Sequence, residues 1–147
     1  MGVKQELLKD RLKDQGYSMT APRLAVFDAL LGQEPQSMSY IIDKVGKAAD
    51  RASVYRTVEL YEKLGIIKRL HIGWKHKLEL SDVFSHHHHH LTCTSCGKIF
   101  PLIENPEFER SIKLLALKER FLPKEHQLEI QGICEDCQTK VAKKEPR

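Results

Sequence analysis

Five consecutive histidines stand directly before a Cys-x-x-Cys sequence, and no ordinary packing requirement accounts for that run. The histidines occupy positions 86–90, and the cysteine pair follows at Cys93 and Cys96. The only other cysteines of the chain form a second pair with the same spacing, Cys134 and Cys137. Because each pair presents two sulfurs on one tight turn, two pairs complete the tetrahedron of thiolates that zinc prefers. We therefore expect the chain to fold around a zinc site made of four cysteines.

Each half of this stretch has an alternative interpretation. The cysteines could form disulfides, but the sequence lacks a signal-peptide pattern, and paired Cys-x-x-Cys in a reducing compartment more often binds metal. The histidines could be a purification tag, but tags usually lie at a terminus. A tag would also leave the adjacent cysteines unexplained. Metal binding is the interpretation that accounts for both features.

The charge of the chain is unevenly divided. Its 147 residues carry a net charge of +4, with 14 lysines and arginines against 10 acidic residues in positions 1–80, and 10 against 10 in positions 81–147. A basic first half indicates a nucleic-acid-binding module followed by a neutral module. No hydrophobic run approaches the length of a membrane span, so we expect a cytoplasmic protein with no membrane partner.

The first half of the chain has the pattern of a helical domain. A short amphipathic helix ending near Gly16 is followed by a helix that starts at Thr20, where Pro22 suits the first turn. Ser37 or Ser39 is expected to cap a third helix. Three amphipathic helices are therefore predicted before residue 50.

A fourth helix is predicted over residues 51–64, because its apolar residues recur on one face. Two alternating strands follow at residues 66–72 and 75–80, on either side of Gly73-Trp74, as in a hairpin. Helices followed by a two-stranded hairpin make a winged helix-turn-helix, in which the last helix enters the major groove of DNA.

The exposed face of this predicted fourth helix suits contact with DNA. Tyr55 can touch a thymine methyl group or a phosphate, Arg56 can neutralise a phosphate or read guanine, and Ser53 can bond the backbone. An ordinary solvated face would carry similar residues, and it is the basic first half and the hairpin that favour DNA. The candidate DNA contacts, including one at the start of the second helix, are Arg23, Arg51, Ser53, Tyr55 and Arg56.

The second half of the chain has the pattern of a small mixed domain. Short strands are predicted at residues 91–93 and 99–102, a helix from Asn105, and a strand at residues 127–133 that leads to the second cysteine pair. The helix should bury a stripe made of Phe108, Ile112, Leu115 and Ala116. We expect the polar tail, residues 140–147, to be disordered. Because so small a domain buries little area alone, we expect a homodimer.

The expected fold class is therefore α+β. Residues 1–80 should form an N-terminal winged helix-turn-helix domain, residues 81–85 a hinge, and residues 86–147 a small α/β dimerisation and metal-binding domain. Side chains alternate along an extended strand, so the even-numbered histidines, His86, His88 and His90, should face away from the odd-numbered pair. One strand could then serve two sites.

The chain resembles the ferric uptake regulator family of bacterial metal-sensing repressors over nearly its whole length. The resemblance rests on an ordered set of segments, which are Thr20-Ala21-Pro22-Arg23, Ala52-Ser53-Val54-Tyr55-Arg56-Thr57, Leu64-Gly65-Ile66-Ile67, the block from His86 to Gly97, and the pair Cys134 and Cys137. It implies a winged helix followed by a dimerisation and metal-sensing domain. Tyr55 and Arg56 match the DNA-contacting tyrosine and arginine of the family.

The metal sites of the family carry over unevenly. The structural zinc site is matched in full by Cys93, Cys96, Cys134 and Cys137. A second metal site in the dimerisation domain is implied at His87, His89, Glu109 and His126, with histidine at 89 where iron sensors often carry aspartate. The regulatory site at the hinge is implied at Glu79, His88 and His90.

Two departures from the family pattern leave the hinge site short of ligands. Ser37 stands where a histidine is usual, and Pro101 stands where an acidic ligand is usual. His71 and His76 of the hairpin are the nearest substitutes, although each also fits an ordinary exposed wing residue. The second divalent metal is expected to be Zn²⁺ or Fe²⁺, and the sequence leaves the choice open.

We expect a metal-dependent transcriptional repressor that binds a palindromic operator as a dimer and is not an enzyme. A zinc hydrolase with Glu79 or Glu109 as the base is one alternative, but no His-Glu-x-x-His motif is present. A metal storage or chaperone protein is the other. It would explain the histidines but not the winged helix.

Overall fold

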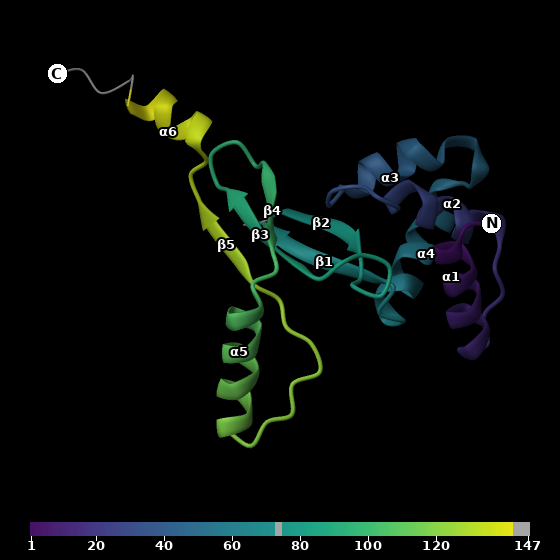
Figure 1. The fold of residues 1–147 in the computed structure, drawn as a ribbon. Helices are drawn as coiled ribbons and strands as arrows, with labels where there is room; N and C mark the ends of the chain where they lie inside the picture. The colour runs from purple at the N-terminus through teal and green to yellow at the C-terminus, as the bar shows by residue number, and fades with distance from the viewer. Residues whose placement is uncertain (73–74, 143–147) are drawn as a thin grey trace. The chain divides into compact units, whose positions relative to one another are not determined.

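The computed structural model describes residues 1–72 and 75–142, which divide into two compact units at the bond between His86 and His87 (Figure 1). The turn predicted at Gly73-Trp74 lies outside the described residues, as do residues 143–147 of the predicted tail. The mixture of helices and strands confirms the α+β prediction. Each unit has its own sheet.

The first unit contains the predicted helices in the predicted order. Their bounds are α1 Val3–Asp14, α2 Ala21–Leu30, α3 Met38–Val45, the 3-10 turn η1 Gly46–Ala48, and α4 Arg51–Lys63. Thr20 occupies the N-cap of α2, and the Oγ of Ser37 accepts a hydrogen bond from the N–H of Tyr40 (3.2 Å) at the start of α3. Gly65 follows α4 with a φ of 64°, a left-handed conformation that glycine adopts without steric cost.

A two-stranded antiparallel hairpin completes the first unit as a winged helix. Strand β1 (Ile67–Ile72) pairs with β2 (Lys75–Leu80), and Gln36 adds a short bridge to Leu78 through backbone bonds of 2.7 and 2.8 Å. The guanidinium of Arg69 on β1 forms two bonds to the carboxylate of Glu62 on α4, at 2.6 and 2.7 Å. This bidentate pair fixes the wing against the last helix.

The core of the first unit is a single apolar cluster to which all four helices and both strands contribute. Its fully buried members include Leu8, Leu12, Phe27, Ile41, Val54, Val58, Tyr61 and Leu78. The stripe predicted on α4 is therefore the face that packs inward.

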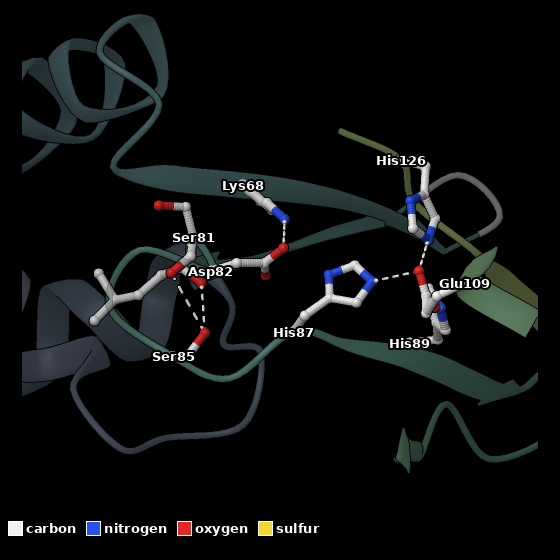
Figure 2. A network of polar contacts seen from close by, with 9 residues as sticks. Lys68, Ser81, Asp82, Ser85, His87, His89, Glu109 and His126 are labelled. Atoms are coloured by element: carbon white, nitrogen blue, oxygen red, sulfur yellow. Dashed lines mark hydrogen bonds and ion pairs between the residues drawn. The ribbon is translucent and has the colours of Figure 1, made fainter. Parts of the chain in front are cut away.

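The segment after β2 is packed into this core. Phe84 is only 2% exposed, and its ring meets that of Phe27 edge-on, with centroids 5.0 Å apart. The N–H of Ser81 donates to the carbonyl of Ile66 (2.9 Å), and Lys68 forms a 2.9 Å ion pair with Asp82 (Figure 2). Most of the segment expected as a hinge, residues 81–85, is thus held by the winged helix.

The second unit is built on a three-stranded sheet with β3 at its centre. Strand β3 (His88–Cys93) pairs antiparallel with β4 (Ile99–Ile103) and parallel with β5 (Glu129–Gly132). It is longer than the strand predicted at residues 91–93 because it takes in three of the histidines. Pro101 lies on β4, whose other side is free of strand pairing in the described chain, where its missing N–H costs no ladder bond.

Two expectations for the helices of this unit are wrong. Helix α5 (Pro106–Lys118) starts at Asn105 as predicted, with the Asn105 side chain as its cap, but none of its described residues is buried, and Leu115 of the predicted stripe is 62% exposed. Figure 1 shows α5 beyond one end of the sheet of the second unit, with the loop that follows the helix running beside it. The tail also begins later than predicted, because helix α6 (Glu135–Ala142) continues past residue 140.

Candidate metal centres and nucleic-acid interface

The four cysteines come together in the second unit. Their sulfur atoms lie within 4.8 Å of one another, and none of them is in a disulfide. The Sγ atoms of Cys96 and Cys134 are 3.7 Å apart. That separation matches the ~3.8 Å edge of a tetrahedron with zinc–sulfur bonds of about 2.3 Å, and exceeds the ~2.05 Å of a disulfide. The predicted cysteine set therefore fits zinc.

Local turns aim these sulfurs inward. The N–H of Gly97 donates to the carbonyl of Cys93 (2.8 Å), and Gly97 has a φ of 72°, so the first turn needs glycine there. The N–H of Cys137 closes the second turn on the carbonyl of Cys134 (3.0 Å). Each short turn thus presents two sulfurs to the same point.

The backbone also prepares one sulfur to be a thiolate. The N–H of Cys134 donates to the Sγ of Cys93 (3.4 Å), and this bond is the main reason that the pKa of the Cys93 thiol falls to about 6. The N–H of Cys137 lowers the pKa of the Cys134 thiol, but burial and three neighbouring thiols outweigh it and raise that pKa to about 12. A cation at the centre would favour the thiolate form of all four.

The histidines separate into two sets along residues 87–90, of which His88, His89 and His90 lie on β3. The rings of His87 and His89 lie 4.8 Å apart between centroids, and those of His88 and His90 lie 4.7 Å apart. Within the strand this is the expected alternation of side chains between the two faces of a sheet.

A second ligand cluster surrounds the carboxylate of Glu109 on α5. Its Oε1 lies 2.6 Å from the Nε2 of His89, and its Oε2 lies 2.9 Å from the Nε2 of His126 and 3.6 Å from that of His87. Figure 2 shows the rings of His87 and His126 pointing at this carboxylate. All four ligand atoms lie within 4.8 Å of one another.

This cluster also has the chemistry of a metal site. The Nε2 of His126 is buried and makes no hydrogen bond within the described chain, although Glu109 is close. Burial opposes ionisation of Glu109, but the hydrogen bond with His89 and the nearby imidazoles outweigh it, so the pKa of the carboxyl lies below its ordinary value. Three imidazoles and one carboxylate suit a borderline divalent metal such as zinc or iron.

The residues implied for the hinge site belong to both units. His88 and His90 lie on β3 of the second unit, and Glu79 is a buried residue of β2 in the first. His71 and His76 occupy directly opposite positions of the hairpin. His76 is three residues from Glu79 on the same strand, so the two side chains project from opposite faces.

Helix α4 carries four of the five predicted DNA contacts, and the fifth, Arg23, lies half-buried on α2. Tyr55 is 40% exposed, and Arg51 and Arg56 are exposed as well. Asp50 caps the helix, since its carboxylate accepts from the N–H (2.9 Å) and the Oγ (2.7 Å) of Ser53, and Ser53 in turn accepts from Arg56 (3.0 Å). The helix therefore presents an ordered set of donors to solvent.

Sequence reasoning missed one polar residue beside this face. Thr57 lies in the apolar stripe of α4 and is buried. A hydroxyl among residues that otherwise read as core was the available signal. Within residues 1–72 and 75–142, no helix is both long and apolar enough to cross a membrane.

Comparison with known proteins identifies the family. The model of the Ferric uptake regulator family matches residues 14–131. The ferric uptake regulation protein of Neisseria meningitidis is 30% identical over 138 residues, which cover 88% of this chain and 92% of that protein. The sequence is thus alike through both units.

Solved structures agree with the sequence match. The Helicobacter pylori ferric uptake regulator, described as having three functional metal binding sites, has a TM-score of 0.74 at 25% identity, and the likeness covers 92% of this chain and 91% of that one. The Vibrio cholerae ferric uptake regulator has a TM-score of 0.67 at 30% identity, with 86% and 98% covered. The chain therefore belongs to the ferric uptake regulator family, whose members are metal-responsive DNA-binding transcription regulators and not enzymes.

Proposed function

We propose that this protein is a cytoplasmic, metal-dependent transcriptional repressor that binds a palindromic operator as a homodimer. The observation that carries the proposal is that one strand, β3, joins a sulfur cluster to a nitrogen–oxygen cluster in a chain that also has a winged helix. The two clusters differ in chemistry, so they suit different roles. A transcription regulator needs both stable folding and a reversible response.

The sulfur cluster is proposed to hold structural zinc. Four thiolates and no open position are typical of sites that stabilise folding rather than sites that react. Cys93, Cys96, Cys134 and Cys137 would hold the ion and join the strand β3 to helix α6.

The cluster of His87, His89, Glu109 and His126 is proposed to hold a second divalent ion, Zn²⁺ or Fe²⁺. Imidazole nitrogen is a suitable ligand for both zinc and iron, so the donor set is compatible with either metal. All four ligands belong to the second unit, so this ion would stabilise that unit.

Glu79, His88 and His90 are proposed to hold the regulatory ion. Glu79 belongs to the winged-helix unit and the histidines to the other, so an ion bound by all three would depend on the angle between the units. An ion that binds one arrangement better shifts the population towards it, and DNA selecting that arrangement must tighten metal binding by the same factor. His71 and His76 project from the other face of the hairpin, which argues against either as a further ligand.

The winged helix is proposed to contact DNA through Arg23, Arg51, Ser53, Tyr55 and Arg56. Arg51, Tyr55 and Arg56 are exposed on α4, and Ser53 on α4 and Arg23 on α2 are half-buried beside them. In this kind of domain the corresponding helix lies in the major groove.

The second copy is proposed to cover the apolar surface of the second unit. Large apolar side chains that are exposed in the single chain gather in this unit, and they include Phe100, Ile103, Leu114, Leu115, Phe121 and Leu122. Large exposed apolar patches on soluble proteins usually mark interaction surfaces, and this many large apolar side chains in one small unit favour such a role. A two-fold dimer would also present two α4 helices to the two halves of a palindrome.

The test is DNA binding against buffered free metal. A duplex selected from a random library by the zinc-loaded protein would be labelled, and its anisotropy followed while Zn²⁺, Fe²⁺ or Mn²⁺ is raised separately. We expect at least one metal to tighten binding tenfold or more at constant salt. Equal affinity with and without every metal would contradict the regulatory role, and failure to select any duplex would contradict DNA binding.

A further inference from the structure

A small pocket of about 240 Å³ opens between the start of α2 and the exposed side of α4. Both helices belong to the first unit, so the pocket is a feature of the winged helix alone. Its polar lining consists of Thr20, Arg23, Ser53, Arg56 and Thr57. No acidic residue lines it among those that the structure describes. Two arginines and three hydroxyl groups around one space are donors to an anion.

The guanidinium of Arg56 is held in place on the wall of this pocket. It donates to the Oγ of Ser53 (3.0 Å), and that hydroxyl donates in turn to the carboxylate of Asp50 (2.7 Å). Asp50 uses its other oxygen to cap α4. The chain of bonds orients Arg56 before any ligand arrives, which lowers the entropy lost on binding.

The opposite wall is fixed as well. The guanidinium of Arg23 lies over the ring of Tyr17, 5.4 Å from its centroid, and donates to the carbonyl of Ser18. The buried hydroxyl of Tyr61 on α4 donates to the backbone carbonyl of Arg23 (2.8 Å). The two arginines are therefore carried by helices that are tied together.

Thr57 adds a further hydroxyl to the pocket. The residue as a whole is only 6% exposed, and it lies on the wall of the pocket beside Arg56. A valine of the same shape would pack equally well among Val54 and Val58. A hydroxyl beside two guanidinium groups can donate a further hydrogen bond to an anion that enters the pocket.

We propose that this pocket seats one phosphate group of the DNA backbone, held by Arg23, Arg56 and the hydroxyl of Thr57. The proposal rests on the DNA-binding function and deepens it. Arg56 is then a phosphate contact, and Tyr55, which does not line the pocket, is left to meet base edges. Phosphate contacts set the register of a helix in the groove, so a phosphate bound in this pocket, here called the phosphate seat, would fix how α4 lies on DNA.

The experiment uses the full-length, metal-loaded protein and a duplex that it selects from a random library. Each phosphate of the duplex is replaced in turn by an uncharged methylphosphonate. We expect one position in each half-site at which the wild-type protein loses at least tenfold in affinity. At that position the same methylphosphonate should lower the DNA affinity of the Thr57→Val protein less than threefold, because this protein has already lost part of its contact with the phosphate. Thr57→Ser keeps the hydroxyl and should behave as the wild type.

Arg51→Gln is the matched control, since Arg51 is an exposed arginine of α4 that does not line the pocket. The Arg51→Gln protein should bind the unmodified duplex more weakly than the wild type. A methylphosphonate at the seat position should still lower its affinity at least tenfold. Arg56→Gln should also reduce the slope of log K against log salt by about one, whereas Thr57→Val should leave it unchanged.

The outcomes separate this proposal from the proposed function. If each methylphosphonate lowers the affinity of the Thr57→Val protein as much as that of the wild type, the proposed phosphate seat is wrong, whereas DNA binding itself still holds. If no duplex is selected, DNA binding itself fails. A free-anion site is the remaining outcome: saturable binding of inorganic phosphate to the protein, unchanged when DNA is bound, would overturn the assignment to DNA.

Discussion

Helices α4 and α5 have the same length of 13 residues and similar amphipathic patterns, but they have opposite surroundings. On α4, Val54, Val58 and Tyr61 are completely or almost completely buried, because α2, α3 and β1 pack around it. On α5 no described residue is buried, and Leu115 lies 62% exposed. An amphipathic pattern therefore predicts which face of a helix needs cover, but not whether its own chain provides it.

The same contrast holds for the interiors of the two units. The first unit is filled by hydrocarbon, whereas the buried described residues of the second are mostly ligands or polar: His89, His90, Thr92, Cys93, Ile99 and Cys137. We infer that the first unit is stable by itself. We also infer that the second depends on metal and on a second copy of the chain.

The largest expected effect is the loss of structural zinc. Cys96→Ser removes one thiolate, and metal binding at such sites contributes roughly 10 to 16 kcal/mol in small zinc-finger peptides. We expect zinc to be released and amide protons of residues 87–142 to exchange rapidly, while those of α2 and α4 stay protected. Ser95→Ala, in the same turn, is the control and should keep its zinc. Uniform loss of protection in both units would show that the first does not fold independently.

The next effect concerns the segment that follows the wing. Phe84→Ala should lower the unfolding free energy of the first unit by about 3 to 5 kcal/mol, the usual cost of deleting a buried aromatic ring. Its exposed neighbour Val83 is the control, and Val83→Ala should change stability by less than about 0.5 kcal/mol. Thermal unfolding measures both. Equal effects would mean that the segment is a free hinge rather than part of the core.

A smaller effect is expected at the apolar face of α5. Leu115→Glu should weaken dimerisation at least tenfold, or about 1.4 kcal/mol, because it places a charge on the face that a second copy is proposed to cover. Lys113→Glu, on the other side of the helix, should leave the dimer intact. Sedimentation velocity across a concentration series gives the dissociation constants. A Leu115→Glu protein that dimerises like the wild type would move the interface elsewhere.

The smallest effect concerns the bond that ties α4 to α2. Tyr61→Phe should cost about 0.5 to 1.5 kcal/mol, since it removes a donor to the buried carbonyl of Arg23. Burial raises the pKa of the Tyr61 hydroxyl, so it stays protonated and keeps donating at all ordinary pH values. Tyr40→Phe is the matched control, because the Tyr40 hydroxyl makes only a 3.5 Å contact with Gln33. Chemical denaturation would reveal equal stabilities if the bond contributed nothing.

Local patterns explain what the sequence could predict. The Cys-x-x-Cys spacing, the alternation of the histidines and the cap at Asn105 depend on a few neighbouring residues, and the structure shows each of these arrangements. The exposure of α5 could not be predicted, since an amphipathic pattern shows which face needs cover but not whether the chain covers it. Phe84 was missed because a single aromatic in an irregular segment has no periodic neighbours. Thr57 was missed because one hydroxyl hardly disturbs an apolar stripe.

The central claim is that an ion bound by residues of both units controls DNA binding. The most direct measurement is the gain in DNA affinity on adding metal, compared between His90→Ala and Glu109→Ala dimers of equal mass. Glu79 belongs to the first unit and His88 and His90 to the second, whereas Glu109 and its three histidines all belong to the second. We therefore predict that His90→Ala abolishes the gain, whereas Glu109→Ala keeps it and loses mainly metal content or stability. A His90→Ala dimer that still tightens on DNA with metal, beside a Glu109→Ala dimer that does not, would assign sensing to the inner site and contradict the account.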